Sequence, residues 1–180
     1  MKKKGFTLIE LIVVIAIIGV LSAILVPAMI GYVVKSKIST QNTAAKQLYN
    51  GLNAAMVEMA TIDLPPKKLV GTRKTTGAKI YAQKDLDIIT EMRKTNPDMF
   101  GILYAKVAQY FSDVAKISEI CYQLRGDGCT GVGVITGNYP GTYPVAITVE
   151  EYRGHNSDWD CTQALEFALD TTGLSPIEDP

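Results

Sequence analysis

The chain has little of the side-chain chemistry on which most enzymes depend. Its 180 residues include a single histidine, His155, so histidine-based acid–base catalysis has only one candidate. No nucleophile motif or phosphate-binding loop occurs in an enzyme-like context. His155 lies near Asp158, Asp160 and Cys161, which are possible metal ligands, but helix caps and a disulfide explain the same residues. The sequence therefore indicates a structural or binding protein, not an enzyme, without a cofactor or a metal site.

Cysteine is scarce, and its number is odd. Cys121, Cys129 and Cys161 allow at most one internal disulfide and leave one thiol unpaired. A disulfide persists only where this part of the chain lies outside the cytosol. The three possible pairings cannot be separated by residue spacing.

Net charge is zero, but the charges are unevenly distributed. Residues 1–84 carry twelve Lys/Arg and three Asp/Glu, whereas residues 85–180 carry six and fifteen. Such asymmetry favours contact between neighbouring copies or with an anionic partner. The basic stretch 67–84 is predicted to be an exposed loop that is either solvated or faces an acidic neighbour. Nucleic acid is a less favoured partner for it, because aromatic residues are nearly absent there.

Charge is entirely lacking between Leu11 and Val34. As a helix, this run is long enough to cross a bilayer core of about 30 Å. The basic start, Lys2 to Lys4, favours a cytoplasmic N-terminus and places the residues after about 35 outside. The sequence therefore predicts one N-terminal membrane span.

Two simpler interpretations of this run leave Glu10 unexplained. A secretory signal peptide could end at Val26-Pro27-Ala28, but its apolar part is normally only about 7–15 residues long. A plain membrane anchor explains the length of the run, yet a carboxylate at the entrance of an apolar segment is costly. Cleavage after Gly5 would create a partner, the α-amino group of Phe6. In a bundle of parallel copies, Glu10 of one chain could pair with that amine of the next and set the axial register.

The start of the chain, three lysines followed by Gly-Phe-Thr-Leu-Ile-Glu, resembles the leader and mature start of type IV pilins and pseudopilins. The resemblance covers about residues 2–35. It implies cleavage after Gly5 by a prepilin peptidase and N-methylation of Phe6. It also implies that Glu10 acts in filament assembly.

The N-terminal helix is expected to continue beyond the membrane, from Phe6 to about Ala60, over roughly 80 Å. Residues 6–34 are apolar all round, and residues 35–60 are amphipathic. Gly19 and Pro27 fall where the family has helix-loosening residues, and Pro27 removes one backbone hydrogen bond. An apolar stripe recurs at three- and four-residue steps and needs cover from a later domain: Ile38, Ala45, Leu48, Leu52, Ala55, Met56 and Met59. The polar side consists of Gln41, Asn42, Lys46 and Asn53.

Residues 61–180 are expected to form a globular head. Helical periodicity is predicted over 85–124, with Asn96 as a cap before Pro97 and Gly126 as a helix end. Strands are predicted at 78–82, 131–136 and 145–152, with a turn at 138–141. A last helix is predicted over 158–169, with Ser157 and Asp160 in a capping box.

Many pilins fasten a C-terminal segment to the head with one disulfide. By this resemblance Cys161 is the expected C-terminal partner, and its mate is Cys121 or Cys129. The third pairing, Cys121 with Cys129, would close only a short turn. A bridge that closes about 30–40 residues is expected to stabilise the fold by roughly 3–4 kcal/mol.

The sequence thus predicts an α+β pilin fold, in which a long N-terminal helix packs against a small antiparallel sheet with additional helices. The resemblance implies a structural subunit of an extracellular type IV pilus, with a precursor in the cytoplasmic membrane. It implies as partners other copies of the chain, the prepilin peptidase and methyltransferase, and an assembly platform with its ATPase. The alternatives are a type II secretion pseudopilin, a minor or tip pilin, and a membrane-anchored binding protein that never polymerises. Adhesion, motility, DNA uptake and secretion are all compatible with the sequence.

Overall fold

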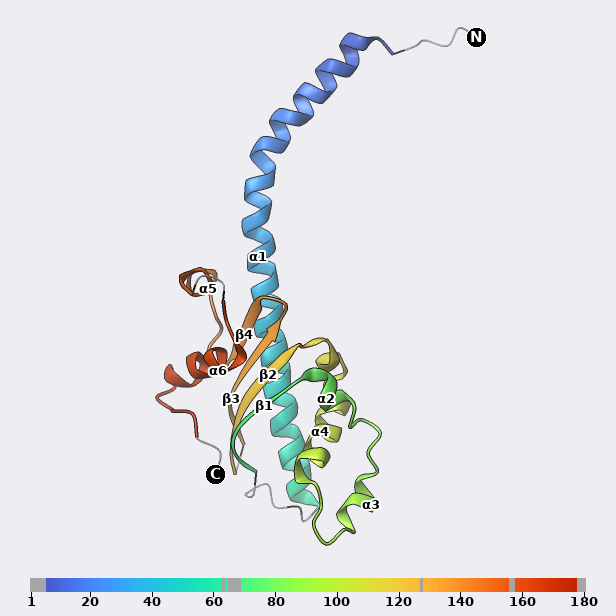
Figure 1. Ribbon diagram of the computed structural model, residues 1–180, viewed down its shortest axis with the longest axis vertical. Helices are drawn as coiled ribbons and strands as arrows, with labels where there is room; N and C mark the ends of the chain where they lie inside the picture. The colour runs from blue at the N-terminus through green and yellow to red at the C-terminus, as the bar shows by residue number, and fades with distance from the viewer. Residues whose placement is uncertain (1–5, 63, 65–68, 127, 156–157, 178–180) are drawn as a thin grey trace, which may run out of the picture. The chain divides into compact units, whose positions relative to one another are not determined.

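A computed structural model describes residues 6–62, 64, 69–126, 128–155 and 158–177 (Figure 1). The internal contacts divide the chain into two units, one that ends at Ser36 and one that begins at Lys37. The long helix α1 (Leu8–Thr61) contributes to both. Its C-terminal part is the central helix of the second unit, the head.

The apolar stripe predicted on α1 is confirmed. All seven of its residues are buried, and Ala45, Leu48 and Leu52 are completely inaccessible. The predicted polar side does not simply face solvent, because Gln41 is buried and Asn42 and Asn53 are half-buried. Only Lys46 among these four is exposed.

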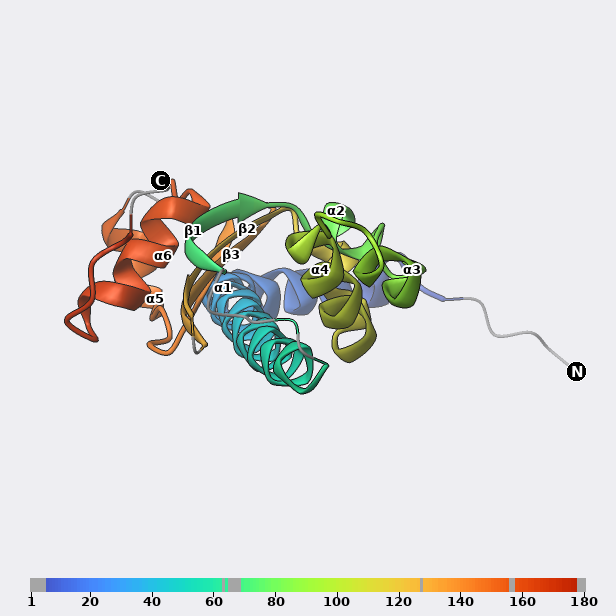
Figure 2. The same ribbon diagram turned by 90° about the horizontal axis from the view of Figure 1, so that it is seen from below.

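Four antiparallel strands pack across α1 in the order β1-β2-β3-β4. They are β1 (Val70–Thr75), β2 (Glu119–Arg125), β3 (Cys129–Thr136) and β4 (Tyr139–Tyr143). Helix α6 (Cys161–Asp170) lies on the face of the sheet opposite α1 (Figure 2). The long helix, the small antiparallel sheet and the additional helices confirm the predicted α+β fold.

Glycine lets both helices approach the sheet closely. A Cβ atom on Gly133 would lie 2.6 Å from the backbone nitrogen of Leu165 in α6, and one on Gly141 would lie 2.1 Å from the carbonyl carbon of Gln41 in α1. Real Cβ atoms do not approach backbone atoms so closely, so a larger residue would push the layers apart. The sheet is therefore buried on both faces at its centre.

The connection from β1 to β2 contains most of the remaining helices. These are α2 (Gly77–Tyr81), α3 (Ile88–Met92), α4 (Met99–Tyr110) and the 3-10 helix η2 (Ser112–Lys116). Helix α4 supplies Ile102, Leu103 and Val107 to the core around α1. The short helix α5 (Val149–Gly154) follows β4.

The prediction of a helix that continues to residue 124 and ends at Gly126 is wrong. Residues 119–125 form β2, a central strand. Ile120 and Tyr122 pack in the core around α1, whereas Cys121 is bonded to α6. A strand buried on both faces loses the alternation of polar and apolar residues, so its apolar spacing can imitate a helix. Gly126 has a φ of 59° in the turn after β2, where a helix cap was expected.

Two predicted strands are helices, and the strands lie elsewhere. Of the stretch predicted as strand 78–82, residues 78–81 belong to α2 and Ala82 is its C-cap, whereas β1 precedes it. Residues 145–152, also predicted as a strand, include the start of α5, where Thr148 and Glu151 form a capping box. The predicted turn at 138–141 is wrong because β4 begins at Tyr139; the turn lies at Gly137 and Asn138. The strand predicted at 131–136 is confirmed within β3.

Two helix starts are shifted relative to the prediction. Helix α4 is capped by Asp98, whose Oδ1 accepts from the Gly101 N–H at 2.9 Å, and not by Asn96. The predicted last helix is confirmed, but α6 begins three residues later, at Cys161, and ends one residue later, at Asp170, with Asp160 as its N-cap. Its capping box pairs Asp160 with Gln163; Ser157, the predicted partner, lies outside the described residues.

Candidate assembly site

The carboxylate of Glu10 forms hydrogen bonds with Thr7 at the start of α1. Its Oε2 accepts hydrogen bonds from the Thr7 backbone N–H at 2.8 Å and from the Thr7 hydroxyl at 2.7 Å. In return, the Thr7 hydroxyl accepts from the Glu10 N–H at 3.4 Å. This is a capping box, and it gives the carboxylate partners within its own chain. The spacing Thr-x-x-Glu was visible in the sequence, but the partnership with Thr7 was not predicted.

Of the two residues at the predicted cleavage site, the structure describes only Phe6. Gly5 lies outside the described residues. Phe6 is 80% exposed and precedes the helix. Cleavage and N-methylation at this position are therefore still predictions.

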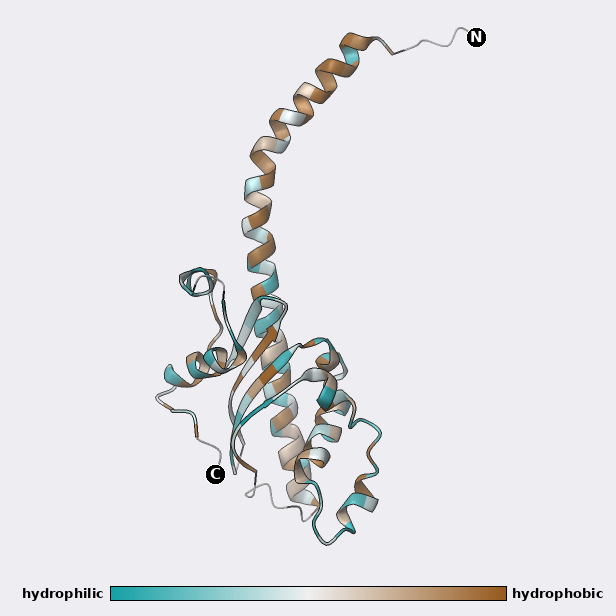
Figure 3. Cartoon of the chain, in the orientation of Figure 1, coloured by the Kyte–Doolittle hydropathy of each residue, from teal (hydrophilic) through white to brown (hydrophobic). Residues whose placement is uncertain are grey.

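Most of the exposed side chains in the described part of the first unit, residues 6–36, are apolar. The described part of the chain has one helix long and apolar enough to cross a membrane, α1, and none of its most apolar window is buried. In Figure 3 the N-terminal part of α1 is coloured mostly as hydrophobic. Gly19 and Pro27 both lie inside the continuous helix; their role as a kink remains a prediction. An apolar surface of this length must be covered by lipid or by protein.

Polar side chains of α1 bind the backbone of the head. Asn42 Oδ1 accepts from the N–H groups of Thr142 at 3.0 Å and Ile147 at 3.3 Å, and its Nδ2 donates to the Ile147 carbonyl at 2.9 Å. About three turns further along, Asn53 Oδ1 accepts from the Cys129 N–H at 2.9 Å, where β3 begins. The sequence showed these residues as a polar side but gave no sign of their partners, which are 76 to 105 residues away.

An ion pair joins the last turns of α1 to α4. The Lys106 ammonium donates to Glu58 Oε1 at 2.5 Å, and the Tyr110 hydroxyl donates to Glu58 Oε2 at 2.8 Å. The Lys106 side chain is 5% exposed, whereas that of Glu58 is 41% exposed. The hydrogen bonds from Lys106 and then Tyr110 lower the pKa of Glu58. The same hydrogen bond to Glu58 raises the pKa of Tyr110.

The disulfide joins Cys121 in β2 to Cys161 at the start of α6. Their Cα atoms are 5.4 Å apart, and the sequence separation is 40 residues. The bridge therefore fastens the outer helix to the central strand. Cys129, the third cysteine, is a buried free thiol, and burial raises its pKa to about 12. Of the pairings that the sequence left open, the structure contains Cys121–Cys161.

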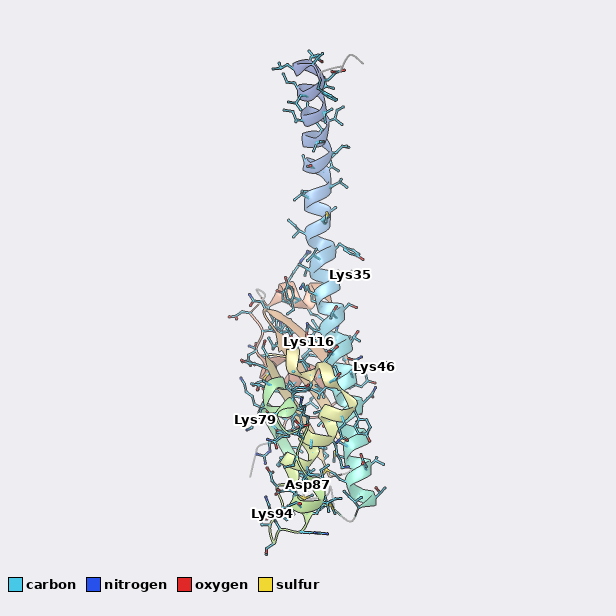
Figure 4. The ribbon with its side chains drawn as sticks, turned by 90° about the vertical axis from the view of Figure 1, so that its right-hand side faces the viewer. Lys35, Lys46, Lys79, Asp87, Lys94 and Lys116 are labelled. Carbon is cyan, nitrogen blue, oxygen red and sulfur yellow. A yellow bond between two sulfur atoms is a disulfide. The ribbon has the colours of Figure 1, made fainter. Side chains whose placement is uncertain are left out.

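The predicted exposed basic loop is largely structured in its described part. Lys74, in β1, pairs with Glu119 at 3.0 Å, and the guanidinium of Arg73 lies 4.6 Å from the centroid of the Phe100 ring. Lys67 and Lys68 lie outside the described residues. Lys79 in α2 and Lys116 in η2 remain exposed on the side of the head shown in Figure 4.

No group of three His, Cys, Asp or Glu side chains suited to a metal ion occurs in the described part of the chain. Two of the residues considered from the sequence have other partners. Cys161 is in the disulfide, and Asp160 accepts from the N–H groups of Thr162 and Gln163.

These features define a class of protein. One helix has an exposed apolar first part with a carboxylate at its start, and the same helix serves as the central core element of an α+β head. By length and composition the apolar part could cross a membrane, so within the described residues this combination is that of a protein in which one long apolar helix continues into a folded head.

Comparison with known proteins identifies the family. Residues 1–26 match the prokaryotic N-terminal methylation motif. A type IV major fimbrial protein, FimA, of Dichelobacter nodosus is 38% identical over 173 residues, which are 95% of this chain and 94% of that protein. The chain belongs to the type IV pilin family.

Other relatives match over shorter stretches. The type IV major pilin protein PilA of Myxococcus xanthus is 50% identical over 48 residues, 27% of this chain and 22% of that protein. The fimbrial protein EcpC of Eikenella corrodens is 62% identical over 37 residues, 21% of this chain and 24% of that protein. No solved structure gives a significant match.

Proposed function

We propose that the chain is the precursor of a structural subunit of an extracellular type IV pilus. Residues 1–5 are the leader, residues 6–34 span the cytoplasmic membrane, and residues 35–60 carry the head, residues 61–180. A prepilin peptidase cleaves after Gly5, and the new N-terminus of Phe6 is methylated. An assembly platform with its ATPase then moves the subunit into the filament.

The exposed apolar part of α1 is the observation that carries this proposal. Side chains such as Leu8, at 77% exposure, and Ile24, at 71%, have no cover within the described chain. Lipid covers them before assembly, and the same helices of neighbouring copies cover them afterwards. At about 25 cal/mol per Å² of apolar surface, this burial is large enough to hold subunits together.

Glu10 is proposed to change partners on assembly. In the single chain its carboxylate is satisfied by Thr7. In the filament, the Phe6 amine of an adjacent copy provides a charged donor, and hydrogen bonds between charged groups are stronger than those to neutral donors. An unpaired carboxylate in an apolar bundle is strongly disfavoured, so this pairing fixes the register of subunits.

The processing step is tested by intact mass and N-terminal analysis of the protein from sheared surface filaments and from membranes. We expect filaments to contain a chain that begins at N-methylated Phe6. A chain that begins at Met1 and is found only in membranes would contradict the proposal, as would a secreted chain that begins after Ala28.

The role of Glu10 is tested with two substitutions that separate charge from helix capping. Glu10→Gln keeps a side chain that can complete a capping box but removes the charge. Thr7→Val keeps the charge but removes the hydroxyl of the box. We expect Glu10→Gln to insert in the membrane and lose filaments, and Thr7→Val to retain them. Normal filament yield with Glu10→Gln would contradict the proposed role of the Glu10 charge in assembly. Absence of the unchanged chain from filaments would favour a membrane-anchored binding protein that does not polymerise.

The same leader serves pseudopilins and minor or tip pilins, so these are the second candidates. The role of a major pilus subunit is favoured over these alternatives, because the long match is to a major fimbrial protein. Subunit abundance in purified filaments separates the alternatives, because a minor or tip subunit would be a small fraction of filament protein.

A further inference from the structure

A groove on the outer side of α6 has no role in the assembly described above. Its volume is about 490 Å³, within the range of small-ligand sites. The lining residues that matter are three aromatic and two acidic side chains: His155, Trp159, Phe167, Glu166 and Asp170. The C-terminal segment around Ser175 forms another wall.

The walls of the groove are held by contacts outside it. The disulfide from Cys121 fixes the first turn of α6 on the sheet. The C-terminal segment is held by Arg125, which donates to the Ser175 carbonyl at 3.4 Å, and by the Ile177 N–H, which donates to Gln123 Oε1 at 2.7 Å. The groove is therefore built before any ligand arrives.

Three aromatic rings meet along the groove. The His155 and Trp159 ring centroids are 4.3 Å apart, and Phe167 meets Trp159 edge-on at 6.0 Å. Trp159 is only 7% exposed, and its Nε1 is buried without a hydrogen-bond partner among the described residues. The Trp159 ring is nearly covered, so the rings that a ligand can reach are those of the exposed His155 and the half-buried Phe167.

The charge of the groove is negative. Glu166 and Asp170 are exposed, stand one turn apart on α6, and form no ion pair within the described chain. Residues 149–177 contain six acidic residues but only one Lys or Arg, Arg153. Carboxylates beside aromatic faces attract a cation both by charge and through the ring quadrupole.

We propose that this groove binds an organic cation, a guanidinium or alkylammonium group held by Glu166 and Asp170 against the aromatic rings. A guanidinium suits it best, because a planar donor can bond a carboxylate and stack on a ring at once. The cation can be a free small molecule or a basic side chain of a protein segment, and the two sources share this chemistry.

The only tryptophan of the chain lies in the groove, so its fluorescence reports on the site without labelling. The full chain, in a neutral detergent or in sheared filaments, is titrated with tetramethylammonium, with arginine ethyl ester and with a short peptide that contains one arginine. The test variants are Glu166→Gln, Asp170→Asn and their combination. Glu150→Gln is the matched control, because Glu150 is exposed on α5 and does not line the groove.

We expect a saturable change in Trp159 fluorescence that sodium chloride at equal ionic strength does not produce. Each single test variant should weaken binding about three- to fivefold, the double variant more, and Glu150→Gln not at all. Saturation by the free cations identifies a small-molecule ligand, and saturation by the peptide alone identifies a protein segment. The proposal is overturned if no cation gives a saturable change, or if the double variant binds as tightly as the unchanged chain.

Discussion

The side-chain amide of Asn42 bonds both backbone groups of Ile147. Its Nδ2 donates to the Ile147 carbonyl at 2.9 Å, and its Oδ1 accepts from the Ile147 N–H at 3.3 Å. The same oxygen accepts from the Thr142 N–H at 3.0 Å. One residue of α1 thus fixes the chain as it leaves β4.

Asn42→Ala is expected to lower the free energy of unfolding of the head by about 1–3 kcal/mol, because the Thr142 N–H and the Ile147 carbonyl lose their partner. The Ile147 N–H keeps a second acceptor, the Thr142 hydroxyl at 3.1 Å. Denaturant unfolding followed by circular dichroism measures the change. Asn50→Ala is the control, since Asn50 is exposed on the same helix and the gain in helix propensity is equal. Equal stability of the two variants would contradict the assigned role.

The Glu58–Lys106 pair should respond asymmetrically to substitution. Glu58→Ala leaves the buried Lys106 ammonium unpaired and is expected to cost about 2 kcal/mol, less than a fully buried pair because Glu58 is partly solvated. Lys106→Met leaves only a carboxylate that solvent reaches, so its cost is expected to be about 1 kcal/mol or less. Unfolding midpoints of both variants and of the unchanged chain test the order. A larger loss for Lys106→Met would show that the partly exposed carboxylate is the group that depends on the pair.

Lowering the pH should reduce the free energy of unfolding of the head, in part because Glu58 becomes protonated. Its pKa in the folded chain lies below the ordinary value of 4.5, so its stabilising contribution is present above about that pH and is lost as the pH falls through the folded pKa. Stability measured from neutral pH to about pH 3 should fall less steeply in Glu58→Gln. Glu91, whose pKa Lys94 also lowers, is unchanged in that variant and adds the same slope to both chains. If stability falls equally steeply with pH in the unchanged chain and in Glu58→Gln, Glu58 does not contribute to acid sensitivity.

The thiol of Cys129 should be inert in the folded protein. It is fully buried, and a pKa of about 12 keeps it protonated, whereas alkylation requires the thiolate. We expect no alkylation by iodoacetamide under native conditions, one modified cysteine after unfolding without reductant, and three after unfolding with reductant. Mass spectrometry counts the modified residues. Native labelling of Cys129 would mean that the start of β3 opens readily.

The apolar stripe of α1 could be predicted because one helix face is buried against a single core, and burial on one face leaves a clear period in the sequence. The strand that contains Cys121 could not be predicted in this way, because α1 covers one of its faces and α6 covers the other. With both faces buried, the pattern of apolar residues no longer distinguishes a strand from a helix. The capping boxes at Thr148–Glu151 and Thr7–Glu10, by contrast, are local signals, because each joins residues only three apart in the sequence.

The sequence by itself determined the family, the long apolar helix and the core face of its second half, because each depends on residues that are neighbours along the chain. Only the tertiary structure decided which cysteines pair, how Asn42 and Asn53 bond to the head, and that aromatic and acidic residues meet beside α6. The disulfide and the asparagine contacts join segments 40 to 105 residues apart. Local propensity does not encode such contacts; they arise when glycines such as Gly133 let the layers pack closely on both faces of the sheet.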